Sequence, residues 1–268
     1  MKKIYLFSLI VFAFISGSQA QVTVTGSTGA NATYPSLTLV GGAFAAINAA
    51  GTQAGNNILI NITADILTET GATALNASDW TTLTINPNGG AIRNVSGTNN
   101  GPLIDLNGAD NVTINGLNSG GNALNLTNLS AGTSASTIRF INDATNNTIT
   151  NFNILGSCTG AASGTVFFST GTVSGNDNNT ILQCNISASA GGTPIYGIFS
   201  LGTSTAIDNS TISVSTNNIS DFFNSTATLL LPSAGINVST NNSGWSITNN
   251  AFYQTATRTA IASNLHYK

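Results

Sequence analysis

The chain has 268 residues and 41% hydrophobic content, but only 6% of its residues are charged, against about 25% in an average soluble domain. Regular Ile, Leu and Val exclude a disordered chain, and the scarcity of Glu, Lys and Arg favours strands and turns over a helical globule. The few basic residues are scattered, which excludes nucleic-acid binding.

Residues 1–20, MKKIYLFSLIVFAFISGSQA, have the pattern of a secretory signal peptide. Two lysines precede an apolar run from Ile4 to Ile15, and small residues lead to a cleavage site after Ala20. The run is shorter than the roughly 20 residues needed to cross a bilayer. We therefore expect a secreted or outer-surface protein with no transmembrane segment after cleavage.

Residues 21–56 are expected to hold an N-terminal strand and a capping helix. Leu37, Val40, Phe44 and Ile47 recur at helical spacing through residues 36–50, SLTLVGGAFAAINAA. A short amphipathic helix there would cover the open first coil of a solenoid.

From residue 57 onward, the sequence predicts short strands that recur in a repeat. Strand-like runs at 57–66, 81–87 and 102–116 precede two similar phrases, NNTITNFNI (146–154) and NNTILQCNI (178–186). Alignment gives one apolar stack with steps of 35, 32, 33 and 33 residues, and a second stack five residues later. A fixed period of this size indicates a solenoid, and short β-branched runs broken by Asn and Gly indicate a parallel β-helix over 57–268. The stacks are Ile114, Ile149, Ile181, Val214 and Ile247, then Ile154, Ile186, Ile219 and Phe252.

Asn153, Asn185 and Asn218 occupy matching places between the two stacks. Asn tolerates the left-handed backbone of a bend, and equivalent Asn side chains in successive coils can bond in a ladder. Runs at 136–142, 165–171, 194–200 and 228–238 are expected to supply the remaining sides of the coils.

The C-terminal segment after Phe252, YQTATRTAIASNLHYK, is too short for another full coil. Because an uncapped β-helix end exposes backbone and core, we expect the sequence to be the N-terminal part of a longer protein. A degenerate last strand with a short tail is the alternative.

The runs GPLIDLNGADNVTINGLNSGGNAL, STIRFINDATNNTITN, GNDNNTI and FYQTATRT carry a resemblance. Together they resemble the large secreted β-helix repeat proteins of Bacteroidota, whose fold is the pectin-lyase-like right-handed parallel β-helix. The resemblance implies an adhesin-type surface or secreted protein, commonly with a C-terminal sorting domain for type IX secretion. It transfers no catalytic motif to this chain.

Residues for catalysis or metal binding are scarce. Glycoside hydrolysis needs two carboxylates about 5–10 Å apart, but Glu69 is the single Glu and the Asp residues are mostly isolated. Asp105 and Asp110 form the best acidic pair; we favour turn residues bonding the backbone over a cation or sugar site, and interpret Asp177 in the same way. The one histidine, His266, is expected in a solvated tail. We predict no catalytic residue, cofactor or metal site.

Core packing is the favoured interpretation of the aromatic residues as a set, and two adjacent pairs, Phe167 with Phe168 and Phe222 with Phe223, are the predicted contact surface. Alternation in a strand would turn one ring of each pair outward. The cysteines, Cys158 and Cys184, enter an oxidising compartment, so a disulfide is allowed, but free buried thiols are favoured.

The leading hypothesis is a structural or adhesive module without a catalytic site, with a polysaccharide or cell-surface glycan as partner. The alternative is a polysaccharide lyase or hydrolase of the pectin-lyase-like class. A third hypothesis is ice binding by flat arrays of Thr and Asn, but we expect that the short phrases TVT and SVST do not recur in register over enough coils to favour it.

Overall fold

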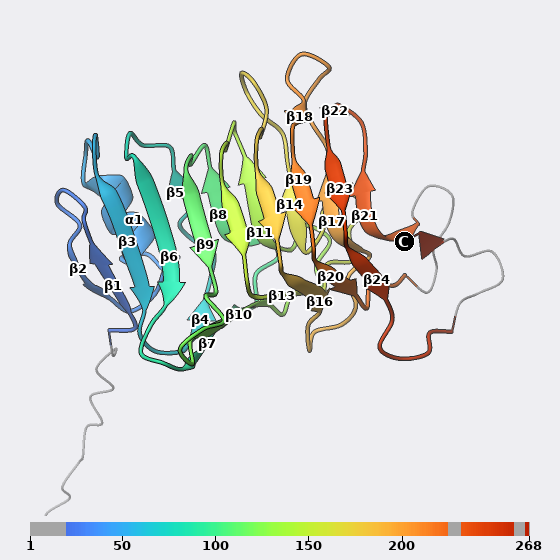
Figure 1. The fold of residues 1–268 in the computed structure, drawn as a ribbon, viewed down its shortest axis with the longest axis horizontal. Helices are drawn as coiled ribbons and strands as arrows, with labels where there is room; N and C mark the ends of the chain where they lie inside the picture. Colours follow the sequence, from blue (N-terminus) through green and yellow to red (C-terminus); the bar gives the residue numbers. More distant parts are fainter. Residues whose placement is uncertain (1–19, 225–231, 260–265, 268) are drawn as a thin grey trace, which may run out of the picture.

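The computed structural model describes residues 20–224, 232–259 and 266–267. The chain winds into stacked coils along one long axis (Figure 1), and each coil adds a strand to each of three sheets. The predicted parallel β-helix is confirmed. Residues 1–19 of the predicted signal peptide, and residues 228–231 of the predicted run 228–238, lie outside the described residues.

We call the three sheets A, B and C. Sheet A has the order β2 (Ala32–Tyr34), β1 (Val22–Thr25), β3 (Asn57–Ile62), β6 (Thr82–Pro87), β9 (Val112–Asn115), β12 (Thr148–Thr150), β15 (Thr180–Leu182), β19 (Ser213–Ser215), β23 (Ser246–Thr248). Sheet B contains β4 (Ile66–Glu69), β7 (Ile92–Gly97), β10 (Ala123–Asn128), β13 (Asn153–Gly156), β16 (Asn185–Ala188), β20 (Asn218–Ser220) and β24 (Ala251–Tyr253). Sheet C contains β5 (Leu75–Asn76), β8 (Pro102–Asn107), β11 (Ser136–Ile141), β14 (Val166–Phe168), β17 (Tyr196–Ser200), β21 (Ser233–Val238) and β25 (His266–Tyr267). Two short strands, β18 (Asn209–Ser210) and β22 (Asn242–Ser243), pair separately.

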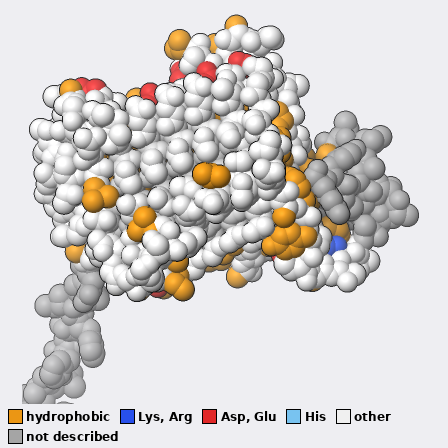
Figure 2. Space-filling view, viewed as in Figure 1, with side chains coloured by type: hydrophobic (Ala, Val, Ile, Leu, Met, Phe, Trp, Pro, Cys, Tyr) orange, Lys and Arg blue, Asp and Glu red, His pale blue; other side chains and the backbone are white. Residues whose placement is uncertain are grey.

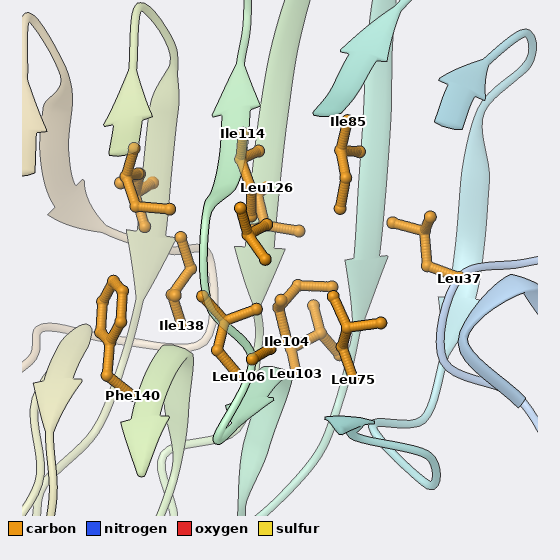
Figure 3. Packing of buried hydrophobic residues seen from close by; sticks show 14 of the residues in the cluster. Leu37, Leu75, Ile85, Leu103, Ile104, Leu106, Ile114, Leu126, Ile138 and Phe140 are labelled. Atoms are coloured by element: carbon orange, nitrogen blue, oxygen red, sulfur yellow. The ribbon is translucent and has the colours of Figure 1, made fainter. Parts of the chain in front are cut away.

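Both predicted apolar stacks are confirmed by the strand register. Ile149 pairs with Ile114 and with Ile181, and Ile154 pairs with Ile186. Alternation turns these residues inward, where aliphatic side chains from all three sheets meet (Figure 3). Burying one large aliphatic side chain contributes about 1.5–3 kcal/mol to the stability of the fold. Because each repeat supplies such side chains, every added coil extends the core.

Left-handed residues form the corners between sheets A and B. Asn151, Gln183, Thr216 and Asn249 occupy equivalent places in successive coils, with φ between 54° and 65°. The predicted bend is therefore present, but its left-handed residue lies two positions before the matching asparagines. Asn153 and its equivalents are instead the first residues of the sheet B strands.

The N-terminal end of the body is covered by β1 and a short helix. β1 pairs antiparallel with β3, and α1 (Ala43–Ala49) buries Phe44 and Ile47 in the core. The capping helix is confirmed, but the prediction that Val40 lies on its apolar side is wrong, since Val40 is 87% exposed. Gly41, at φ +85°, keeps the chain in a turn until the helix begins after Gly42.

The last coil is less covered than the others. Ile247 continues the first apolar stack but is 43% exposed, whereas its partner Val214 is fully buried. His266 was expected in a solvated tail, but its backbone pairs with Ser233 in sheet C. The coil of β23 and β24 thus gains a third strand from residues 266–267.

Candidate functional site

The four phenylalanines of the predicted contact surface divide into two buried and two half-buried residues. Phe168 and Phe222 belong to the core, where the Phe168 ring stacks on Phe140 with centroids 4.5 Å apart. Phe167 and Phe223 are half-buried. Phe167 alternates with the inward residues of β14, so its ring lies on the outer face of sheet C, whereas Phe222 and Phe223 follow the end of β20.

The Phe167 ring belongs to a second apolar cluster, outside the coils on sheet C. Its register partner in β17 is Phe199, with ring centroids 5.7 Å apart, and Phe199 stacks on Tyr196 at 5.2 Å. Tyr196 and Phe199 are only 2% and 3% exposed. Burial raises the pKa of the Tyr196 phenol, opposed by a hydrogen bond with Asn237. Phe167 is therefore the ring of this group that a ligand could reach.

A bidentate ion pair lies beside Phe167 on the same face. Arg139 is in register with Phe167 on one side and with Asp105 on the other. Its Nε and Nη2 donate to the two Asp105 carboxylate oxygens at 2.9 and 2.8 Å, and the side chains are 27% and 11% exposed. Asp105 and Asp110, the best acidic pair in the sequence, therefore have separate partners.

Other aspartates link one coil to the next. Asp110 accepts hydrogen bonds from the N–H and hydroxyl of Thr145, and Asp177 accepts the same two bonds from Ser210. Both carboxylates therefore bond the backbone, as expected for them, although the backbone that they bond belongs to the next coil. The same arrangement joins Asp143 to Thr172 and Asp221 to Thr255.

The Asp143 link is the most extensive. Its carboxylate accepts the Thr172 hydroxyl and the N–H groups of Thr172, Val173, Ser174 and Gly175, the N–H contacts being 2.8–3.1 Å long. Burial alone would raise the pKa of Asp143, but these hydrogen bonds lower it to about 2. The charge is therefore used to hold the loop 171–175.

Within the described ranges, no group of three His, Cys, Asp or Glu side chains is placed to hold a metal ion. Across the same residues, no helix has the length and hydropathy needed to span a bilayer. Cys158 and Cys184 are buried and unbridged, so the allowed disulfide is not formed. Burial raises the pKa of both thiols, that of Cys184 to about 12, which leaves them protonated at neutral pH.

Sheet B carries a ladder of side-chain amides on its outer face. At each step, Nδ2 of one residue donates to the side-chain oxygen of its equivalent in the preceding coil, at 2.6–2.9 Å. The ladder predicted for Asn153, Asn185 and Asn218 is confirmed, and it extends back to the Asp65 carboxylate, whose pKa is lowered chiefly by Asn94. Its members are Asp65, Asn94, Asn125, Asn153, Asn185 and Asn218.

Sheet A carries outward side chains in two columns from β6 to β23, in one continuous register. The expectation that Thr phrases do not recur in register over enough coils is therefore wrong. The phrases differ in sequence, but alternation places a hydroxyl at the same outward position of each strand. The first column is Thr84, Thr113, Thr148, Thr180, Ser213 and Ser246, and the second includes Asn115, Thr150, Leu182, Ser215 and Thr248.

Comparison with known proteins does not add a family to this description. No family model, no curated protein and no solved structure matches the chain. The β-solenoid fold and the three outer faces are thus the basis on which its function is inferred.

Proposed function

We propose that the chain is a secreted or cell-surface structural and adhesive module that binds glycans on an outer sheet face and has no catalytic site of its own. The signal-peptide pattern and the resemblance to Bacteroidota repeat proteins support the location. The stacked coils support the adhesive role, because a solenoid presents extended surfaces to its partners.

The observation that carries the proposal is the group formed by Phe167, Arg139 and Asp105, which we call the sheet C patch. A half-buried aromatic ring offers a flat apolar surface to the C–H face of a sugar. The ion pair beside it supplies both donors and acceptors for sugar hydroxyls. Aromatic and charged groups thus lie next to each other in register.

Binding of immobilised glycans and soluble polysaccharides by the full chain tests this proposal. Phe167→Ala should weaken glycan binding by about tenfold, which is the effect of losing about 1.4 kcal/mol. Leu182→Ala is the matched control, since Leu182 is also half-buried and outward but lies on sheet A. Equal binding by both variants would contradict a role for the sheet C patch.

The enzymatic alternative is separated by a second assay. The chain is incubated with acidic polysaccharides in the presence of Ca²⁺, and new chain ends are measured over time. We expect no turnover; sustained release of product would overturn the non-catalytic part of the proposal.

A further inference from the structure

The first column on sheet A consists of six side chains that each carry a hydroxyl. Among the described residues, none of the six side chains makes a hydrogen bond with another part of the chain. Four of the six are threonines, and these four side chains are half-buried. The amides of the sheet B ladder, in contrast, bond to one another. Since each hydroxyl offers one donor and two acceptor positions, the column presents its full hydrogen-bonding capacity outward.

The positions in this column are spaced by the sheet itself. Neighbouring strands lie about 4.8 Å apart, so six positions form a row about 24 Å long. Along a strand, the second column lies two residues away, at about 6.6 Å. The row has no register shift from β6 to β23. The hydroxyls of the first column therefore form a regular row rather than an isolated pocket, whereas the second column is broken by Leu182 and by Thr150, whose hydroxyl is buried.

The surface is also free of charge where the columns run. All outward positions from β6 to β23 hold Thr, Ser, Asn or Leu. The face of the molecule in Figure 2 is likewise almost without Asp, Glu, Lys or Arg colour away from its edges. An ice surface is likewise neutral and repeats its donors and acceptors at fixed intervals.

We propose that the first column of sheet A binds the surface of ice. The interval between strands is close to a lattice repeat of hexagonal ice, so successive hydroxyls meet equivalent water positions. The β-branched threonines in the column have restricted side-chain rotamers, which reduces the entropy lost on binding. This activity goes beyond the proposed glycan binding and does not depend on it, because the two use different sheets.

Thermal hysteresis and inhibition of ice recrystallisation by the full chain test this inference. Thr148→Tyr places a bulky ring in the middle of the column. Thr127→Tyr is the matched control, because Thr127 is a half-buried outward threonine on sheet B without a hydrogen-bonded side chain among the described residues. Circular dichroism and the melting temperature establish that both variants are folded.

We expect hysteresis and recrystallisation inhibition from the wild type, a loss of at least half of each in Thr148→Tyr, and no loss in Thr127→Tyr. A wild-type chain with neither effect would overturn the proposal whatever the variants do. Equal losses in two folded variants would assign the activity away from sheet A and overturn it as well. If Thr148→Tyr does not fold, Ser213→Tyr replaces it at the next but one position of the column. Glycan binding is measured separately on the same samples. The glycan result alone decides the proposed function, and the ice result alone decides this inference.

Discussion

Replacing Asp143 with Asn tests whether its carboxylate stabilises the fold by holding the loop 171–175. The pKa of Asp143 is lowered from 3.8 to about 2, which at 1.36 kcal/mol per unit corresponds to about 2 kcal/mol. Because the carboxylate keeps some contact with water, solvent screening reduces the expected contribution to about 1–2 kcal/mol. Asp143 has a φ of 70°, a left-handed conformation that Asn also adopts, so the substitution does not strain the backbone.

The direction of the pH dependence follows from the lowered pKa. The folded pKa of Asp143 lies below its ordinary value of 3.8, so the stabilisation is present above that value and is lost as the pH falls toward 2. We expect Asp143→Asn to lower the free energy of unfolding by about 1–2 kcal/mol at neutral pH. The difference should shrink to a small fraction of this value near pH 2, where the wild-type carboxyl is half protonated, and vanish at still lower pH.

Urea denaturation of wild type and variant at both pH values measures this difference, and hydrogen exchange of the amides of Val173, Ser174 and Gly175 locates it. Asp208→Asn is the control, since it removes the same charge from a carboxylate that makes no hydrogen bond among the described residues. A loss of equal size at both pH values, or an equal loss in the control, would refute the role of the Asp143 charge.

Three further predictions concern the core, the thiols and the buried glutamate. Ile181→Ala should cost about 2–5 kcal/mol in urea denaturation, because Ile181 is fully buried, whereas Leu182→Ala on the outer face should cost less than about 1 kcal/mol; similar losses would contradict the inward stack. Cys184 should resist alkylation by iodoacetamide in the folded chain and react after unfolding, since burial raises its pKa to about 12; rapid native labelling would exclude this. Burial raises the pKa of the Glu69 carboxyl above 4.5, so the wild type should lose stability as the pH rises through the folded pKa. The free energy of unfolding of Glu69→Gln should depend less on pH over the same range. Parallel pH profiles of wild type and variant would contradict this role of Glu69.

The repeat made the core and the ladder predictable from sequence. The period is fixed by the coil, so aligned Ile and Asn residues must lie in register once the coils stack, as Ile149 and Ile181 do. The same alignment contains the signal for the first hydroxyl column, because its members from Thr113 to Ser246 each lie one residue before the inward residue of their strand. That signal is missed when short phrases are compared by letter instead of by position.

Features that depend on contacts outside the repeat were harder to predict. The helix begins at Ala43 rather than near Leu37, because Gly41 and Gly42 hold a turn that the apolar spacing does not reveal. Asp105 was paired in the sequence with Asp110, but its partner is Arg139, one coil later. The sequence alone also does not predict which ring of an adjacent pair is accessible. Phe222 and Phe223 lie beyond the end of β20, where the alternation of a strand no longer applies.

The amide ladder also governs how the length of this protein can change. Every amide nitrogen of the ladder donates in the same direction, toward Asp65. Each coil is therefore aligned by a hydrogen bond to the coil before it. A single-residue insertion would turn an outward Asn toward the core, whereas removal of residues 147–178 would bring Ile181 beside Ile114 and leave the pattern intact. Evolution can therefore shorten or extend such a body in whole coils, with each new coil aligned by the bonds that align the old ones.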